Sequence, residues 1–345
     1  MTVNSIAKNI SQKICDSFPN YNLTPNLLFM KLSRLNMYMA KMPEGMAEAN
    51  YFYKNTSIYF NEKIDIKDVE EFAIHECIHF IQEIKDKRNS LVRMGLCDYS
   101  NFKVYGLGLN EAAVQLMTSK IIGIPKDFVK YFGISFETTS PSYYPLECCL
   151  VNQLAYLVGE DILFESTINS NDNFRNTFSN LTSPQTYIAI QNAIDDILYA
   201  EEDIIKLNNK IAQSNQDDNI NNWQRKIEEL KNEITLTFMR TQNLIISSYF
   251  DNEFNRLSNL EEVENYRRKI YNFKSYIGLT DNYTFFNKYY IQKMEDLENL
   301  YVSIENGTFE KQTVPVIVKK NKIFNIFKAI KNLIFGNSPK QEKSI

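Results

Sequence analysis

Hydrophobic residues recur at helical spacing over most of the chain. The segment Asn26–Lys41 is dense in Leu and Met, which predicts a buried helix that ends before Pro43 and Gly45. Asp68-Val69-Glu70-Glu71 resembles a capping box and predicts the start of a second helix that runs to about Asp86. Helices are therefore expected to dominate the first part of the chain.

A strand-like segment lies between these two helices. Tyr51-Phe52-Tyr53 and Ser57-Ile58-Tyr59-Phe60 are rich in β-prone residues, and the polar run Lys54-Asn55-Thr56 between them predicts a hairpin. Two further helices are predicted downstream, from about Asn110 to Ile122 and from Pro145 to near Gly159, since proline suits the first helical position and glycine the end of a helix. The pattern therefore predicts an α+β fold that is predominantly helical.

From about residue 185 onward the pattern becomes almost wholly helical. Apolar residues recur there at spacings of three and four in two stretches, which the polar run Ser214–Asn222 separates. This arrangement indicates two helices joined by a short connection, as in a helical hairpin of the coiled-coil type. The apolar positions are Ile204, Leu207 and Ile211 in the first stretch and Ile227, Leu230 and Ile234 in the second.

A basic amphipathic segment lies near the end of the sequence, over residues 319–336. Its apolar residues fall on one helical face and its lysines on the other, which is typical of a helix that lies on an anionic membrane or docks into the groove of a partner protein. A last helix that packs on its own domain is the alternative interpretation. The apolar face comprises Ile323, Ile326, Phe327, Ile330, Leu333 and Ile334, and the lysines are Lys319, Lys320, Lys322, Lys328 and Lys331.

Composition and charge exclude several classes of function. The formal charge of the 345 residues is −4 at pH 7, which gives no electrostatic basis for nucleic-acid binding. The cysteines number five and two of them are adjacent, so reduced thiols are expected rather than a disulfide framework. The N-terminus does not resemble a signal peptide, and no apolar run reaches the roughly 18 residues of a spanning helix, so a cytoplasmic protein is expected.

The two histidines of the chain fall together in the segment His75-Glu76-Cys77-Ile78-His79. Residues at i and i+4 project from one face of a helix, about 5–6 Å apart, so two imidazoles can bind one ion. Glu76 lies one position around the helix, where it can reach a metal-bound water without being a ligand. Apart from Glu76, the residues between and beside the histidines are uncharged, as a helix buried beneath a metal site requires, namely Ile74, Cys77, Ile78 and Phe80. This spacing predicts a metal site.

A catalytic zinc site takes three protein ligands and leaves one position for water. Since the chain has no third histidine, the remaining ligand must be a carboxylate or a thiolate. Glu111 is the best candidate, because it opens a predicted helix and the two alanines after it permit close packing against the first helix. Glu147 and Asp161 are rival carboxylates that lack this context. Cys77 is expected to point to a different face of the helix and to fill the core.

The segments His75–His79 and Asn110–Ala112 together resemble the gluzincin group of zinc metallopeptidases. In that group, two histidines and a later helical glutamate bind zinc, and the glutamate after the first histidine acts as the base. The resemblance therefore implies a peptide or protein substrate and one Zn²⁺ ion, with Glu76 as the base. The ligands that it implies are His75, His79 and Glu111.

The same resemblance suggests how the chain is divided. It extends loosely over residues 50–165 and implies a zincin-like catalytic domain, with a small β-sheet and an active-site helix, over residues 1–185. A helical domain is then predicted over residues 186–312 and a basic tail over residues 313–345. The strand at about Ser57–Phe60 is expected beside the cleft, where gluzincins hold extended substrates by strand addition.

The chemistry implied is metal-assisted hydrolysis. Zinc lowers the pKa of its water, Glu76 takes the proton, and hydroxide attacks a carbonyl that the metal polarises. The oxyanion needs one further donor, and Tyr143 and Tyr144, just before the third predicted helix, are the candidates.

One residue departs from the family. Many gluzincins carry an acidic residue about one turn after the ligand glutamate, whereas Gln115 here can accept a hydrogen bond without supplying charge.

Other functions agree with the same residues. One is a non-peptidase zinc hydrolase on the same scaffold. Another is a helical interaction or membrane-surface protein whose zinc site is structural or vestigial, although structural sites normally have four ligands, often cysteines. Two histidines and a carboxylate also bind iron in oxygenases, where the first pair is usually His-x-Asp or His-x-Glu. A helical half that recognises one partner protein for cleavage would fit the order of the domains.

Overall fold

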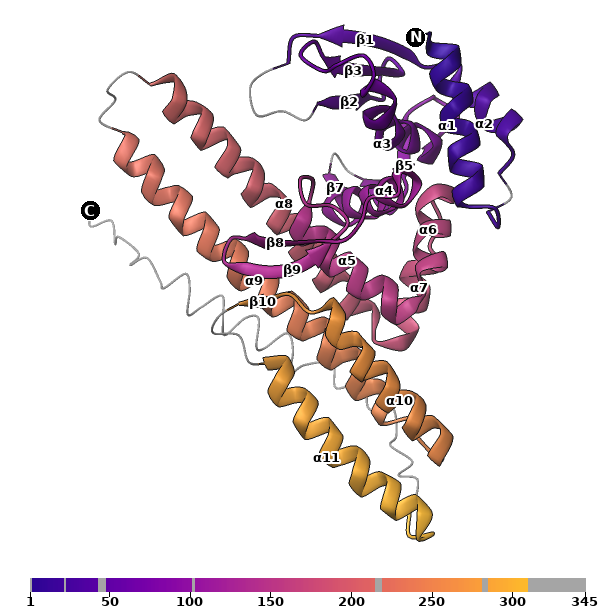
Figure 1. Cartoon of the computed structure of the whole chain (residues 1–345), viewed down its shortest axis with the longest axis vertical. Helices are drawn as coiled ribbons and strands as arrows, with labels where there is room; N and C mark the ends of the chain where they lie inside the picture. The colour runs from indigo at the N-terminus through magenta and orange to yellow at the C-terminus, as the bar shows by residue number, and fades with distance from the viewer. Residues whose placement is uncertain are drawn as a thin grey trace, which may run out of the picture.

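The computed structural model of the chain describes residues 2–21, 23–42, 48–100, 103–214, 219–280 and 285–309. Within these residues helices predominate and three small sheets accompany them, so the expected α+β, predominantly helical class is confirmed (Figure 1). The predicted basic tail, including its amphipathic segment 319–336, lies outside the described residues. No helix among the described ones has both the length and the apolar run that a membrane crossing demands.

The elements follow one another in an irregular order of helices and short strands. The helices are α1 (Val3–Ser17), α2 (Pro25–Leu32), α3 (Val69–Gln82), α4 (Leu107–Ile122), α5 (Pro145–Val158), α6 (Glu160–Asn169), α7 (Asn173–Leu181), α8 (Pro184–Gln213), α9 (Ile220–Phe254), α10 (Leu260–Phe273) and α11 (Phe285–Glu305). The strands are β1 (Asn36–Ala40), β2 (Ala49–Phe52), β3 (Ser57–Asn61), β4 (Glu83–Lys85), β5 (Leu91–Met94), β6 (Cys97–Ser100), β7 (Lys103–Tyr105), β8 (Asp127–Tyr131), β9 (Ile134–Thr138) and β10 (Leu279–Thr280).

The predicted helix over Asn26–Lys41 is only half correct. α2 begins at Pro25 with Thr24 as its N-cap, but it ends at Leu32, and residues 36–40 form β1. β1 pairs in parallel with β3 along its whole length, from Asn36 opposite Ser57 to Ala40 opposite Asn61. Leu- and Met-rich sequence favours a helix locally, and here the inter-strand hydrogen bonds with a distant segment override that preference.

The predicted hairpin is confirmed, but its second strand, β3, is the central strand of the sheet and not an edge strand. β2 and β3 are antiparallel and pair from Ala49 opposite Phe60 to Phe52 opposite Ser57. The order in this sheet is β1-β3-β2, so both edges of β3 are occupied. The strand Ser57–Phe60 therefore cannot receive a substrate strand. The edge without a strand partner belongs to β2 instead, and there the backbone N–H of Tyr51 donates a hydrogen bond to the Glu76 side chain of α3.

The three helices predicted around the metal segment are present with shifted ends. α3 begins after Asp68, whose side chain makes no cap hydrogen bond, so the predicted capping box is absent. It ends at Gln82 rather than near Asp86, because residues 83–85 pair with β5 as β4. α4 begins three residues before Asn110, and α5 begins at Pro145 and ends before Gly159 as predicted.

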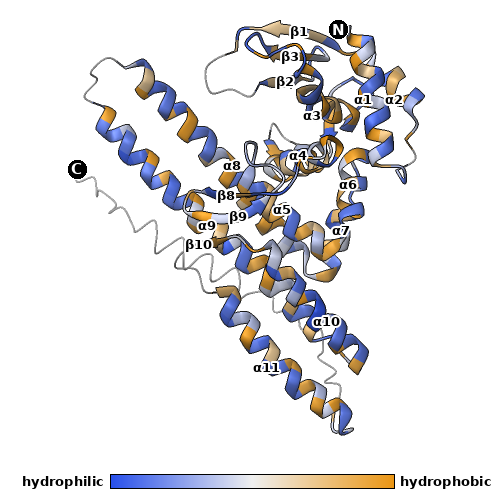
Figure 2. Cartoon of the chain, in the orientation of Figure 1, coloured by the Kyte–Doolittle hydropathy of each residue, from blue (hydrophilic) through white to orange (hydrophobic). Residues whose placement is uncertain are grey.

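The predicted helical hairpin is formed by α8 and α9, which lie side by side across the molecule (Figure 1). Figure 2 shows hydrophobic and hydrophilic residues alternating along both helices, as an amphipathic pair requires. The buried positions include Ile204, Ile227, Leu230 and Ile234. The division of the chain at residue 185 stays a prediction, but one hydrophobic core runs from the N-terminal helices through α8 and α9.

A buried carboxylate of α8 caps the helix α4. Asp195 accepts hydrogen bonds from the backbone N–H groups of Gly106 (2.7 Å) and Gly108 (2.8 Å), at the N-terminus of α4. Gly106 has a positive φ of 80°. A Cβ at Gly108 would lie 2.8 Å from the carbonyl oxygen of Ile194, so only glycine allows this approach. The carboxylate satisfies N–H groups that a helix leaves unpaired, and α8 thereby fixes where α4 begins.

Asp195→Ala is expected to destabilise the protein by about 2–3 kcal/mol, because two buried N–H groups lose a charged acceptor. The matched control is Asp196→Ala, the same substitution at the next position of α8, which is expected to change stability by only about 0.5 kcal/mol. Urea unfolding followed by circular dichroism measures both. Equal losses in the two variants would show that the cap contributes nothing specific.

Candidate metal centre

α3 presents the residues of the predicted metal segment from inside the fold. Most of the helix is buried, and the exposed fraction is 5% for His79 and 9% for Glu76. Cys77 is fully buried and belongs to the hydrophobic core, as expected for a residue on another face of the helix. Burial on nearly all sides explains why so few charged residues occur in α3 after its first turn.

Three side-chain atoms converge between α3 and α4. The Nε2 atoms of His75 and His79 lie 3.0 Å apart, and Glu111 Oε2 lies 3.2 Å from the first and 3.3 Å from the second. In the described part of the chain, these residues form the single group of three potential ligands close enough to hold one metal ion. The structure thus brings together the three residues that the sequence singled out.

The size of this triangle fits a small ion. Three donors of a tetrahedral site with bonds of about 2.0–2.1 Å lie about 3.3–3.4 Å from one another. The separations here are at or slightly below that value, so an ion can bind all three atoms with only small side-chain movements. Three protein ligands leave the fourth position of a tetrahedron for a water molecule or a substrate atom. The group can therefore hold a metal ion with one open position.

The ligands carry a strong mutual attraction before any ion binds. Burial alone would lower the pKa of His79, but the charge of Glu111 and a hydrogen bond to it raise that pKa to about 9. Burial likewise opposes ionisation of Glu111, and the two imidazoles outweigh it and hold the Glu111 pKa well below its usual range. The metal-free site therefore contains a buried His79–Glu111 ion pair, which a divalent cation can replace.

Each imidazole is oriented through its second nitrogen by a glutamine. His75 Nδ1 lies 3.0 Å from Gln115 Oε1, and His79 Nδ1 lies 3.2 Å from Gln82 Oε1. When each Nδ1–H donates to its glutamine oxygen, each Nε2 keeps a lone pair directed at the centre of the triangle. Gln115 thus lies behind a ligand histidine, where many gluzincins carry an acidic residue. The contact of Gln82 was not predicted, although its position three residues after His79 in a helix was a usable signal.

Glu76 lies beside the triangle without belonging to it. Its Oε2 accepts a 2.7 Å hydrogen bond from the backbone N–H of Tyr51 in β2. The same tyrosine donates its hydroxyl to Glu83, 2.7 Å away, which ties β2 to the end of α3. Tyr51 was expected only as a strand residue. Its backbone role is invisible in sequence, because any residue except proline supplies an N–H.

The structure separates the two candidate tyrosines. Tyr144 lies with its ring 6.3 Å from that of His75, at an angle of 27°, whereas the Tyr143 hydroxyl donates to Glu48 at 2.5 Å. Burial and the carboxylates of Glu111 and Glu76 raise the pKa of Tyr144 well above its ordinary value. Its hydroxyl therefore keeps its proton and remains a donor. Tyr144 also has a positive φ of 50°, a costly conformation that often marks a functional site.

The rival ligands lie elsewhere. Glu147 is fully buried in the first turn of α5, and burial raises its pKa to about 7. Asp161 accepts a 3.3 Å hydrogen bond from the hydroxyl of Tyr21. Neither carboxylate belongs to the group around His75 and His79.

The comparison of the chain with protein-family models, with curated proteins and with solved structures gave no match.

The affinity of the site for a divalent metal is expected to rise about tenfold per pH unit and to level off near pH 9. The sign follows from the raised pKa: His79 holds its proton below about pH 9 and must release it to bind a metal. In Glu111→Gln the carboxylate is lost, so affinity falls and the plateau moves toward the ordinary histidine pKa of about 6.5. Titration against a chelator at several pH values measures both. An affinity of the wild type that does not change with pH would contradict the ion pair.

Proposed function

We propose that the protein is a zinc-dependent hydrolase and that its substrate is a peptide or protein. The observation that carries this proposal is the convergence of His75, His79 and Glu111 beside an uncoordinated carboxylate, Glu76. A structural zinc site usually closes its coordination shell with four protein ligands. Three ligands with a neighbouring acid favour an open, catalytic site, in agreement with the resemblance of these segments to the gluzincins.

Zinc is the metal that best suits these donors. Two imidazole nitrogens and one carboxylate oxygen are typical ligands of catalytic zinc, and the small triangle suits tetrahedral coordination. Calcium and magnesium prefer oxygen ligands in larger numbers. When bound, the ion supplies a Lewis acid and a water of lowered pKa.

Glu76 is the residue that we assign as the base. A carboxylate next to the open position can accept the proton of the attacking water and pass it to the leaving amine. Its Oε2 accepts one hydrogen bond from Tyr51, which holds the side chain without neutralising it.

Tyr144 is the donor that we assign to the oxyanion. Its ring lies against His75, and the carboxylates of Glu111 and Glu76 are close enough to raise the pKa of its hydroxyl, which therefore keeps its proton. A donor at that place can stabilise the negative charge that develops on the carbonyl oxygen of the substrate. Tyr144 adopts a positive φ of 50° at the N-cap of α5, a costly conformation of the kind that clusters at functional sites.

A peptide substrate is supported by the position of β2. This strand forms one edge of its sheet, and the N–H of Tyr51 already points from that edge to Glu76. An extended peptide can add to such an edge through main-chain hydrogen bonds, which places its carbonyl groups near the metal. We therefore assign the binding of an extended substrate to β2 and not to Ser57–Phe60 of β3, to which the family resemblance assigned it.

Glu76→Gln is expected to keep its metal and to lose hydrolysis by roughly 10²–10⁴-fold, because the amide still accepts a hydrogen bond but cannot take a proton. The matched control is Glu71→Gln, the same change at an exposed position of α3, which should cleave like wild type. Metal analysis and profiling of cleaved peptides in a proteome digest measure the two properties. Metal-bound wild type with the same cleavage profile as Glu76→Gln would reject the hydrolase and favour a structural site.

Tyr144→Phe is expected to lower kcat by roughly 10²–10³-fold with a smaller effect on KM, since the hydroxyl acts mainly on the charge of the transition state. Tyr143→Phe removes the neighbouring hydroxyl, which binds Glu48, and should leave kcat close to wild type. Steady-state kinetics on one identified peptide separates the two parameters. Equal losses of kcat in both variants would contradict the assignment of Tyr144.

A further inference from the structure

The side chain of Gln82 has one possible orientation. Its amide nitrogen donates a 3.0 Å hydrogen bond to the backbone carbonyl of Thr167 in α6, and a carbonyl oxygen can only accept. The amide oxygen must therefore face the other way, toward His79 Nδ1 at 3.2 Å. That oxygen in turn requires a proton on Nδ1, which leaves Nε2 free to bind a metal. A backbone group of α6 thus determines the tautomer of His79.

Asn110 is fixed in the same manner and joins Gln82 to the other ligand helix. Its Oδ1 accepts a 3.0 Å hydrogen bond from the backbone N–H of Leu96, which can only donate, and a 3.2 Å bond from Gln82 Nε2. Asn110 directly precedes Glu111 in α4. One chain of hydrogen bonds therefore runs from His79 through Gln82 to Asn110, the residue beside the third potential ligand.

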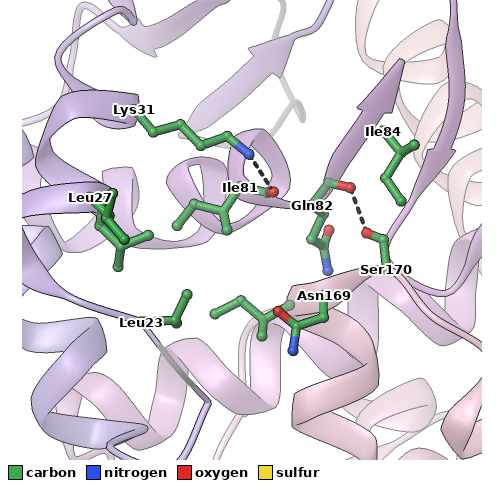
Figure 3. A pocket seen from close by; sticks show the side chains of 10 residues that line it. Leu23, Leu27, Lys31, Ile81, Gln82, Ile84, Asn169 and Ser170 are labelled. Carbon is green, nitrogen blue, oxygen red and sulfur yellow. Dashed lines mark hydrogen bonds between the residues drawn. The ribbon is translucent and has the colours of Figure 1, made fainter. Parts of the chain in front are cut away.

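The surroundings leave room for these two side chains and for little else. Gly95 adopts a positive φ of 59°, and a Cβ there would lie 2.0 Å from Asn110 Oδ1 and 2.4 Å from Gln82 Nε2. Gln82 and Asn110 are both fully buried. On the far side, Gln82 borders a pocket of about 300 Å³, where the Ser170 hydroxyl donates to the Gln82 backbone carbonyl (Figure 3). The two amides therefore pack closely against Gly95 and are joined by hydrogen bonds to the backbone of Thr167 and Leu96.

We infer that Gln82 and Asn110 form a positioning unit that fixes the ring of His79 and the spacing of α3 and α4, and thereby sets the affinity of the site for zinc. The inference rests on the metal site of the proposed function and not on its peptidase activity. Groups that orient a ligand histidine typically change metal affinity by about 10–100-fold when they are removed. Neither residue touches the metal, so their effect acts through His79 and through the approach of the two helices.

The test compares two buried glutamines. Gln82→Met has nearly the same shape but donates and accepts no hydrogen bond at the amide position. Gln153→Met is the matched control, because Gln153 is also fully buried and also donates its amide to a backbone carbonyl, that of Tyr276 at 3.0 Å. Gln82→Asn is a milder variant that keeps an amide in the site but is one methylene too short to reach both His79 and Asn110.

The measurements are zinc affinity by chelator competition on the full chain, the cobalt spectrum as a report on coordination geometry, and thermal unfolding of the metal-free proteins. Gln82→Met and Gln153→Met are both expected to lower the melting temperature. Only the two Gln82 variants are expected to lose zinc affinity, by about 10–100-fold, and to alter the cobalt spectrum. Gly95→Ala is also expected to lower the zinc affinity, because its added methyl group would displace both amides.

Two results would overturn the inference. One is a zinc affinity of folded Gln82→Met and Gln82→Asn equal to wild type, and the other is an equal loss of affinity in Gln153→Met. The proposed function fails on a different result, namely wild type that binds zinc and cleaves no peptide. In that case the zinc affinities of the variants would still decide the role of Gln82.

Discussion

The close approach of α3 and α4 is the constraint on which the site depends. Side-chain atoms of the two helices meet within 3.3 Å, and they do so where little water enters. Asn110, Glu111 and Gln115 of α4 all contact side chains of α3, which ties the two helices together along one face of α4. The cap on α4 comes from Asp195 of α8, far along the chain. α8 therefore helps to position α4, one of the two helices that supply the potential metal ligands.

Electrostatics makes this arrangement dependent on a positive charge between the ligands. The raised pKa of His79 stabilises the metal-free fold below about pH 6.5, and that contribution is lost as the pH rises through about 9. Glu111, whose pKa is lowered, needs a cationic partner at every pH above its own. A proton on His79 fills this need at low pH, and a divalent metal ion in the same place could fill it at high pH. A bound ion would then stabilise the same buried carboxylate in the pH range where the proton is lost.

The sequence predicted the group of potential ligands better than the fold around it. His75, His79 and Glu111 could be found because helical spacing and alanines are local signals, and the start of α5 followed from Pro145, whereas α3 begins near the expected residue without the predicted capping box. The strand β1 could not be found, since its partner β3 lies about twenty residues away and its own sequence favours a helix. The roles of Asp195 and of the Tyr51 N–H depend on tertiary contacts alone. Such contacts leave no periodic trace in the sequence.

The use of amides rather than carboxylates behind both histidines has a chemical consequence. A carboxylate partner makes a ligand imidazole more basic and strengthens its donation to the metal. Gln115 and Gln82 orient the rings without that push, so a bound zinc would keep more of its positive charge and acidify its water more strongly. The cost is weaker binding of the ion, and rigid placement of the ligands offsets it because less ordering is needed on binding. Under the proposed zinc chemistry, the immobilised amides would therefore favour a more acidic metal-bound water over a tightly held ion.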